Sequence, residues 1–403
     1  MHTATIVAQV MQCCLPLMHA ARWRALHDVV VSSVNGCALS LVALAVGTPR
    51  TISVRHRVKC VDRLLGNTHL KADCFDLYAA LARQWLTGLP QLLIVVDWSS
   101  LTADMQWHWL RASIVCDGRS ITLYEEVHPR KHLGSLAVHK RFIKRLAQLL
   151  PKSTHPPIVM TDAGFRNTWF RLIAAQGWQW LGRVRNRDFV RKVDSVDWLP
   201  AKQLYGQARA VAADLGAFET VRNHPLKCRL VLVKHAPKGR KHRYASGKVK
   251  NNSTARKIAS RYREPWLLSC SPSLGHLSAE AVVRLYAQRM RIEEEFRDTK
   301  NVVLGAGLAL SRSHGQQRLQ ALLLIGHIAQ VAKRLIGEAA KSAQLHLQLT
   351  STCRKDRAEL SVMMLAKRVI DSPALLRKLK SAWPSWHVLR GQASAAINRA
   401  MAA

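Results

Sequence analysis

Acidic residues are scarce in this chain of 403 residues, where 25 Asp and Glu stand against 61 Lys and Arg and the formal net charge is +36. Such a surplus makes a compact chain repel itself unless a polyanion neutralises it, so nucleic acid is the expected partner. The chain is nevertheless 48% hydrophobic, which argues against a disordered basic tail. Its length predicts two or three domains. A basic surface without enzymatic activity is the alternative at this point.

The sequence also lacks any Cys-x-x-Cys pair, and its nine cysteines are scattered along the chain. This argues against a disulfide scaffold and against a zinc ribbon. The first twenty residues have no basic segment ahead of an apolar core, so no secretory signal is expected. The apolar stretches at 37–46 and 321–328 are too short to span a bilayer. We therefore expect a cytoplasmic protein without a membrane partner.

The first 88 residues have apolar positions at helical spacing and predict a helical domain. Within it, Arg55, Lys59 and Arg63 recur every four residues beside an apolar stripe, and a Gly-Asn pair then ends the helix. The cationic stripe is compatible with a helix that lies on DNA. An ordinary amphipathic helix with a solvated face fits it equally well.

From residue 91 the pattern changes to that of a mixed sheet. A continuous apolar run at 92–96 is typical of a buried central strand. Asp117-Gly118 predicts a hairpin between strands at 107–116 and 120–127. Helices are expected at 135–150 and 167–176, and further strands at 157–162 and 179–184. This order predicts an α/β fold with a mixed sheet.

Short β-like segments continue to about residue 275 around a long basic stretch. No Asp or Glu occurs between Lys234 and Arg263. A block of like charge of this length is usually a flexible loop that orders on a polyanion. We expect it to contact DNA through four of its cations: Lys238, Arg240, Lys241 and Arg243. A solvated loop without that role is the alternative.

A helix is expected from Ser278, a suitable N-cap, to about Lys300. At about 100° per residue, one face of this helix presents a tyrosine, a carboxylate and three cations: Tyr286, Arg289, Glu293, Arg297 and Lys300. Such a face suits a phosphodiester, because the carboxylate can complete a metal site while the cations hold flanking phosphates. A salt-bridged solvent face has the same pattern, since these charges are ordinary i, i+4 partners.

Two aspartates, Asp97 and Asp162, each follow a predicted apolar strand. Catalytic groups of α/β sheets gather at the carboxyl ends of strands. Two carboxylates brought together repel each other unless a cation lies between them, and hard oxygen ligands suit Mg²⁺ or Mn²⁺. A turn or N-cap aspartate is the alternative for each residue taken alone.

The spacing Tyr286-x2-Arg289-x3-Glu293-x6-Lys300 resembles the Tyr-Arg-Glu-Lys signature of bacterial insertion-sequence transposases of the DDE class. The segments around Asp97 and Asp162, Val-Val-Asp-Trp-Ser and Thr-Asp-Ala-Gly-Phe, are similar to the other two catalytic segments of that family. The likeness is greatest to its cut-and-paste, hairpin-forming members. It covers about residues 55 to 340.

The resemblance implies an RNase H-like mixed-sheet core in which Asp97, Asp162 and Glu293 are catalytic and coordinate two Mg²⁺ ions, for which Mn²⁺ can substitute. It also implies a β-rich insertion domain before Glu293, in which Trp266 stacks on a flipped base; a packed core tryptophan is the alternative. The remaining signature residues and one further cation then contact DNA: Tyr286, Arg289, Arg297 and Lys300.

We therefore expect five segments. They are a helical N-terminal DNA-binding domain (1–88), a first part of the core (89–185), the β-rich insertion domain (186–275), a second part of the core (276–340) and a helical C-terminal region that is a candidate for dimerisation (341–403).

The implied function is cut-and-paste DNA transposition. Metal-dependent cleavage of transposon ends would proceed through a hairpin intermediate, followed by strand transfer into target DNA. The partners would be terminal inverted repeats and target DNA, held by a homodimer in a synaptic complex at the bacterial nucleoid. The alternatives are an RNase H-like nuclease or recombinase without strand transfer, and an inactive DNA-binding relative.

Neutralising Lys238, Arg240, Lys241 and Arg243 together is expected to flatten the salt dependence of DNA affinity, because each phosphate contact contributes to the slope of log K against log salt. Binding titrations over a range of NaCl concentrations measure that slope. An unchanged slope would identify the stretch as a solvated insertion.

Overall fold

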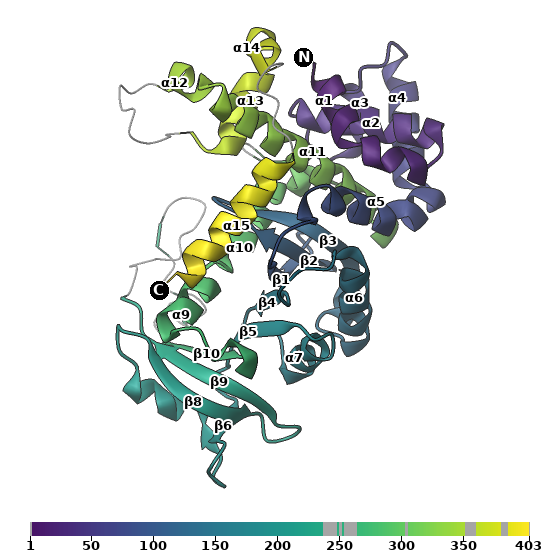
Figure 1. The fold of residues 1–403 in the computed structure, drawn as a ribbon. Helices are drawn as coiled ribbons and strands as arrows, with labels where there is room; N and C mark the ends of the chain where they lie inside the picture. Colours follow the sequence, from purple (N-terminus) through teal and green to yellow (C-terminus); the bar gives the residue numbers. More distant parts are fainter. Residues whose placement is uncertain are drawn as a thin grey trace. The chain divides into compact units, whose positions relative to one another are not determined.

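The computed structural model describes residues 2–236, 248–249, 252–253, 264–302, 305–350, 360–379 and 386–402, and Figure 1 labels their helices and strands. The four cations of the predicted DNA-contacting loop lie outside the described residues: Lys238, Arg240, Lys241 and Arg243. The hypothesis about that loop therefore stays a prediction.

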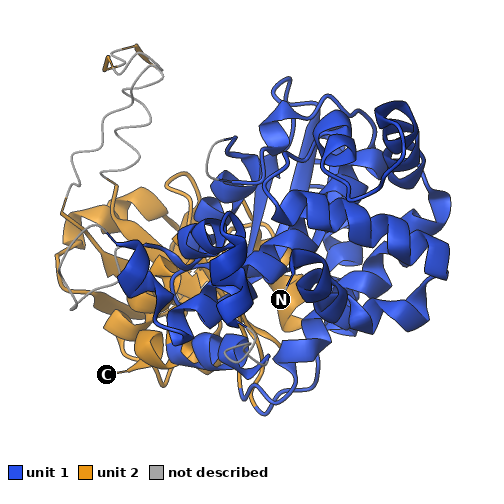
Figure 2. Cartoon of the chain, turned by 90° about the horizontal axis from the view of Figure 1, so that it is seen from above, with its two compact units in different colours: residues 1–90, 96–154, 291–395 blue, residues 91–95, 155–290, 396–403 orange. Residues whose placement is uncertain are grey.

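The chain is a mixed α/β protein whose residues divide into two compact units, coloured separately in Figure 2. Unit 1 comprises Met1–Pro90, Val96–Thr154 and Arg291–Ala395. Unit 2 comprises Gln91–Val95, His155–Met290 and Ala396–Ala403. The five predicted segments follow other boundaries and stay predictions.

Unit 1 is mainly helical. Its first part holds five helices: α1 (Thr3–Val10), α2 (Ala20–Val34), α3 (Leu41–Val46), α4 (Val54–Leu65) and α5 (Thr68–Leu86). The others are α6 (Leu136–Leu149), α10 (Met290–Lys300), α11 (Gln316–Ser342), α12 (Leu345–Leu349), α13 (Val362–Ile370), α14 (Pro373–Lys378) and α15 (His387–Met401), of which α10 begins and α15 ends in unit 2. The expected stop of α4 is confirmed, because Gly66 is its C-cap.

The predicted hairpin is confirmed in unit 1. Strand β2 (Trp107–Val115) pairs antiparallel with β3 (Ser120–Pro129). Gly118 adopts φ +78° in the turn, a left-handed conformation that glycine takes without steric cost. Nearly every residue of both strands is buried, so the hairpin forms a rigid support for the helices of this unit.

Helix α11 is the central helix of unit 1. It packs against α2, α5, α13 and β3, and Gln320 on it donates to the carbonyl of Glu125 and accepts from the amide of Val127 at 2.9 Å each. Helix α11 is long and apolar enough to cross a membrane by length and composition alone, but most of it is buried inside the protein. That burial is typical of a core helix.

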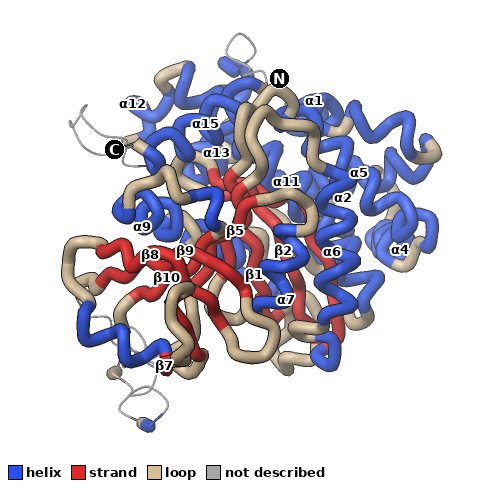
Figure 3. The backbone as a smooth tube through the Cα atoms, turned by 60° about the horizontal axis from the view of Figure 1, so that its bottom comes forward, coloured by secondary structure: helices blue, strands red, loops and turns tan. Residues whose placement is uncertain are grey.

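Unit 2 is built on a mixed sheet, whose strands are red in Figure 3. Within this unit the strand order is β1-β4-β5-β10-β9-β8-β6-β7, where β1 (Leu93–Ser100) contributes Leu93–Val95. The other strands are β4 (Ile158–Thr161), β5 (Gln179–Arg183), β6 (Phe189–Lys192), β7 (Leu199–Pro200), β8 (Ala213–Thr220), β9 (Leu226–Val233) and β10 (Trp266–Cys270). This unit also contains helices α7 (Asn167–Ala174) and α9 (Ala279–Ala287).

The sheet of unit 2 changes direction between its two halves. Strand β4 is parallel to β1 and to β5, whereas β10 runs antiparallel to β5 and begins an antiparallel series with β9, β8 and β6. The strands predicted at 157–162 and 179–184 and the helix predicted at 167–176 are confirmed by β4, β5 and α7.

The prediction of one continuous helix from Ser278 to about Lys300 is wrong. Ser278 does cap α9, since its Oγ accepts from the amide of Ala281 at 3.1 Å. The helix then breaks, because the amides of Gln288 and Arg289 bond three residues back rather than four, which tightens the turn. Tyr286 and Arg289 are thus separated from the helix α10 that carries Glu293, Arg297 and Lys300.

No disulfide joins the eight cysteines in the described part of the chain. Burial raises the pKa of Cys74 and of Cys116 to about 12 in unit 1, and that of Cys270 to about 12 in unit 2. These thiols are therefore protonated and chemically quiet in the folded protein.

The buried carboxylate of Glu295 holds α10 on the β2–β3 hairpin. Its side chain accepts hydrogen bonds from the hydroxyls of Ser113 (2.8 Å), Ser120 (2.6 Å) and Thr122. Arg111 lies 3.5 Å away and is fully buried as well. A buried charge is tolerated only when it is paired and hydrogen-bonded, and here four partners meet that condition.

Replacing Glu295 with Ala is expected to destabilise the fold by about 3 kcal/mol, because three buried hydroxyls lose their acceptor, while Arg111 keeps its closer partner Glu125 at 2.7 Å. Glu294→Ala is the matched control, since Glu294 is half-exposed and pairs with Arg119 at the surface; we expect a loss within about 1 kcal/mol. Urea unfolding measures both values. Similar small losses in the two variants would contradict the assignment.

The stability difference between wild type and the Glu295→Ala variant should depend on pH. Burial alone would raise the pKa of Glu295, but Arg111 and the three hydroxyls outweigh it and hold the pKa below its ordinary value of 4.5. The contribution of this carboxylate is complete above the unfolded-state pKa and is lost as the pH falls through the folded-state pKa. The difference between wild type and the Glu295 variant should therefore shrink in acid.

Candidate active site

Asp97 lies near the end of β1, in the part of that strand that belongs to unit 1. The residue is only 9% exposed, and its Oδ1 accepts a hydrogen bond from the backbone amide of Trp98 at 2.8 Å. The apolar residues before it bury the strand, so the carboxylate is held in a fixed position.

Lys300 lies beside the end of β1. Its Nζ donates to the hydroxyl of Ser99 at 2.8 Å, two residues beyond Asp97 along the strand. Burial and the nearby Arg111 lower the pKa of Lys300. Unit 1 therefore places one signature cation of α10 next to the segment that carries Asp97.

Glu293 and Arg297 are one turn apart on α10, and both are exposed. Lys300 follows on the same helix face and is half-buried. This face presents a carboxylate and a cation to solvent, while the opposite side of the helix is anchored through Glu295. Of the five residues predicted to share one helix face, Glu293, Arg297 and Lys300 share a face of α10.

A buried histidine supports the residue that follows Asp97. The indole Nε1 of Trp98 donates to Nε2 of His139 at 3.1 Å, and the ring of His128 packs against Trp98 at 5.5 Å between centroids. Because Nε2 accepts this bond, it carries no proton. Burial, and secondarily the charge of His128, lower the pKa of His139 to about 4.

Asp162 begins a tight turn in unit 2, directly after β4. Its Oδ1 accepts from the amide of Gly164 at 2.7 Å. A Cβ at position 164 would stand 2.7 Å from that same oxygen, so any larger residue there would displace the Asp162 carboxylate. Arg185 donates to the carbonyls of Ala163 and Gly164, the latter at 2.7 Å, and fixes the turn.

Three predicted DNA-binding residues of unit 2 are neighbours. The rings of Trp266 and Tyr286 meet edge to face at 5.2 Å between centroids, and the guanidinium of Arg289 lies 5.9 Å from the Tyr286 ring. Tyr286 is buried, whereas Trp266 is half-buried. Trp266 therefore belongs to an aromatic cluster and keeps part of its surface accessible.

The predicted site residues thus fall into two groups. Unit 1 contains Asp97, Glu293, Arg297 and Lys300, and unit 2 contains Asp162, Trp266, Tyr286 and Arg289. Among the residues that the structure describes, no three His, Cys, Asp or Glu side chains gather closely enough to hold a metal ion. The contacts within each group join Lys300 to Ser99 near Asp97 in unit 1, and Trp266, Tyr286 and Arg289 to one another in unit 2.

The cationic stripe predicted in the N-terminal helices is exposed on α4, where Arg55, Lys59 and Arg63 all face solvent. The opposite face buries apolar residues such as Val61 and Leu64. This arrangement fits both a DNA-contacting helix and a solvated one.

Two sets of residues were not predicted from the sequence. The first is Glu295, which no sequence pattern singles out and which is the buried anchor of α10. The second set consists of arginines that line a cavity after Asp162; Arg183, Arg185 and Arg187 alternate in the sequence, and an alternating cation pattern at a strand end is the signal that could have revealed them.

The family model of the transposase DDE domain matches residues 88–331, more than half of the chain. The chain belongs to the DDE transposase family. It is therefore an enzyme of the class that cleaves DNA by phosphoryl transfer, and DNA is its partner. The matched range of this DDE transposase includes Asp97, Asp162 and Glu293.

Among solved structures, the cryo-EM structure of a piggyBac transposase synaptic complex with hairpin DNA is similar to this transposase at 11% sequence identity and a TM-score of 0.42. The alignment covers 96% of this chain and 79% of that chain. No curated protein matches the chain.

Changing His139 to Gln is expected to reduce the loss of stability in mild acid. Burial lowers the pKa of His139 to about 4 in the folded protein. In the unfolded chain this histidine titrates near its ordinary pKa of 6.5, so it takes up a proton at pH values where the folded protein does not. Wild type then loses stability as the pH falls from 6.5 toward 4.

Between about pH 7 and about pH 5, wild type should lose about 2 kcal/mol more than His139→Gln, at 1.36 kcal/mol per pKa unit. The glutamine keeps an acceptor for Trp98 but does not titrate. Urea unfolding at the two pH values measures the difference, and equal losses would show that His139 titrates normally in the folded protein.

Proposed function

We propose that this DDE transposase performs cut-and-paste transposition of a bacterial insertion sequence, with Asp97, Asp162 and Glu293 as its catalytic, metal-binding carboxylates. The observation that carries the proposal is the register of two parallel strands, in which Leu93 of β1 pairs with Ile158 of β4 and Val95 pairs with Met160.

Asp97 comes two residues after Val95, and Asp162 comes two residues after Met160. Each aspartate therefore follows the paired segment of its own strand by the same two residues, at the carboxyl end where α/β enzymes hold their catalytic groups. An RNase H-like core, which we infer for this chain, places its first two carboxylates in this way.

The chemistry of the donor set fits divalent magnesium. All three residues offer hard carboxylate oxygens, and the apolar strands before the two aspartates hold these side chains in defined positions. Carboxylates that share a site favour a cation between them. When bound, Mg²⁺ ions supply Lewis-acid activation of the attacking and the leaving oxygens at phosphorus.

The cations of the chain then position the DNA. Arg297 is exposed one turn from Glu293 and can hold a phosphate that flanks the scissile bond, while Lys300 orders the end of β1 through Ser99. The half-buried Trp266 offers an indole on which an unpaired base can stack.

Cleavage, hairpin formation, hairpin opening and joining are all in-line displacements at phosphorus, so one set of carboxylates can serve every step. The attacking groups are water and a DNA 3′-hydroxyl, and no protein nucleophile is required. Recognition of two terminal inverted repeats in one synaptic complex calls for a homodimer, in the bacterial cytoplasm where the nucleoid DNA lies.

Changing Asp97, Asp162 or Glu293 singly to Ala is expected to reduce the rate of nicking at the element's end by at least about 100-fold. Each change removes an interaction with charge that develops in the transition state. DNA affinity in the absence of metal should stay close to that of wild type. Denaturing gels of labelled end DNA with Mg²⁺ measure cleavage, and binding titrations in EDTA measure affinity.

Glu294→Ala is the matched control on α10, because its side chain pairs with Arg119 away from the proposed site; it should cleave normally. A variant of one of the three carboxylates that cleaves like wild type would remove that residue from the catalytic set. Recovery of joined donor and target plasmids distinguishes a transposase from a nuclease or recombinase that stops after cleavage.

A further inference from the structure

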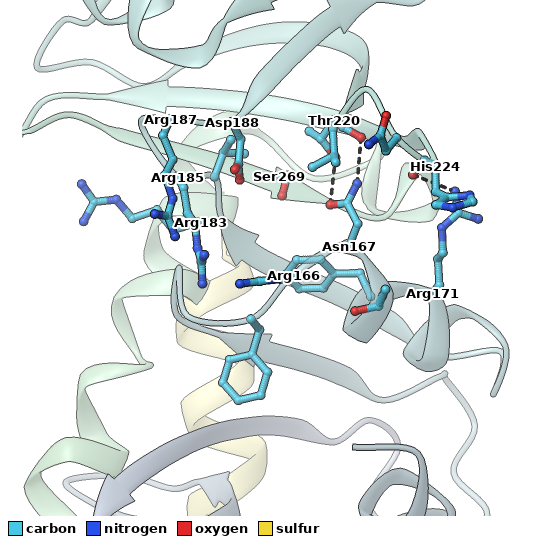
Figure 4. A pocket seen from close by; sticks show the side chains of 16 residues that line it. Arg166, Asn167, Arg171, Arg183, Arg185, Arg187, Asp188, Thr220, His224 and Ser269 are labelled. Atoms are coloured by element: carbon cyan, nitrogen blue, oxygen red, sulfur yellow. Dashed lines mark hydrogen bonds between the residues drawn. The ribbon is translucent and has the colours of Figure 1, made fainter. Parts of the chain in front are cut away.

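A cationic cavity lies wholly within unit 2, a few residues beyond Asp162. Its volume is about 590 Å³, within the usual range for pockets that bind small ligands. Five arginines and one aspartate supply its charged lining: Arg166, Arg171, Arg183, Arg185, Arg187 and Asp188. Figure 4 shows Arg183, Arg185 and Arg187 gathered on one side of the pocket, with Arg171 on the other.

The pocket has rigid walls. Asn167, at the start of α7, donates from Nδ2 to the carbonyl of Thr220 at 2.7 Å and accepts from the Thr220 hydroxyl at 3.2 Å, as the dashed lines in Figure 4 show. Arg171, one turn later, donates to the carbonyl of His224 at 3.1 Å. These bonds tie α7 to the strand β8 and its following turn, so the cavity is a built feature of the fold.

Two of the arginines are available to a ligand. Arg166 and Arg187 are exposed, and the side chain of neither makes a hydrogen bond or an ion pair with another residue in the described ranges. Arg183 and Arg185 instead donate hydrogen bonds to backbone carbonyls. Burial, and then the nearby charges of Arg187 and Arg166, lower the pKa of Arg185.

The backbone adds to the attraction for anions. The first turn of α7, Asn167 and Thr168, lines the pocket, and the N-cap residue Arg166 makes no side-chain hydrogen bond to that turn. A helix N-terminus carries a partial positive charge and unpaired amides. Together with the arginine side chains, it forms a concave surface suited to a phosphate oxyanion.

We propose that this pocket is a phosphate-binding subsite that takes the backbone of a DNA strand, held by Arg166, Arg187 and the first turn of α7. The pocket has the volume of a small-ligand site, so a strand's sugar–phosphate backbone enters it and a duplex does not. The assignment of DNA as the source of the phosphate rests on the proposed function. The residues of this pocket differ from the three proposed catalytic carboxylates and from the four cations of the predicted basic loop.

The test measures binding of a labelled single-stranded DNA of random sequence in EDTA at several NaCl concentrations. Arg166→Gln combined with Arg187→Gln should weaken binding and lower the slope of log K against log salt by about 1.4, since each of the two lost phosphate contacts to a single strand contributes about 0.7. The corresponding double Lys variant keeps both charges and should retain most of the slope.

The matched control is Lys202→Gln combined with Arg209→Gln, which removes two exposed charges from unit 2 outside the pocket. Its slope should stay that of wild type. An equal fall in both double variants would mean that only overall charge matters, and would overturn the proposal.

Inorganic pyrophosphate is the second probe. Calorimetry that detects saturable pyrophosphate binding to wild type but not to the double Gln variant, together with an unchanged DNA slope, would assign the pocket to a free phosphate compound and overturn the DNA assignment. Because EDTA prevents cleavage, these results are independent of whether Asp97, Asp162 and Glu293 catalyse. Failure of the catalytic proposal is seen only in the nicking assay.

Discussion

The carboxylate of Glu295, buried among Arg111 and three hydroxyls, is the interaction on which the geometry of unit 1 depends. A helix whose surface is as polar as that of α10 has little apolar area with which to dock, so hydrophobic burial alone would not fix its rotation. The polar network does so, because only one rotation places Glu295 against the hairpin. The residues on the outward face, Glu293 and Arg297, are oriented by the same constraint. Buried networks of this kind contribute more to a unique arrangement than to net stability.

Much of the fold could be predicted because its signals are local. The Asp117-Gly118 turn and the apolar run before Asp97 depend on a few consecutive residues, and both elements are present. The helix break after Tyr286 could not be predicted, since its residues are good helix formers and tertiary structure overrides propensity. The role of Glu295 was equally hidden, because its hydroxyl partners lie more than 170 residues earlier in the chain. For the candidate site, the residue types and the strand ends that carry them could be predicted from the sequence. The arginine pocket could not, because residues from separate segments line it only in the folded chain.

The scarcity of acidic residues affects how charge is distributed over the two units. Several of the few carboxylates are committed to internal pairs, such as Glu295 with Arg111 and Asp214 with Arg229. This leaves the exposed cations of α4 and the arginines of the unit 2 pocket in excess over the acids beside them. The net charge is therefore presented as separate cationic surfaces on both units. A polyanion such as DNA can contact several of them at once, and each contact adds to the salt dependence of binding.

The buried cysteines give each unit a chemical reporter of its own motions. Cys74 and Cys116 lie in unit 1 and Cys270 lies in unit 2, and all three thiols are held protonated by burial. A thiol reagent can reach such a group only when the surrounding structure opens, so the labelling rate follows the local opening equilibrium. Modification mapped residue by residue would then show whether DNA tightens one unit, the other or both, without any foreign label in the chain.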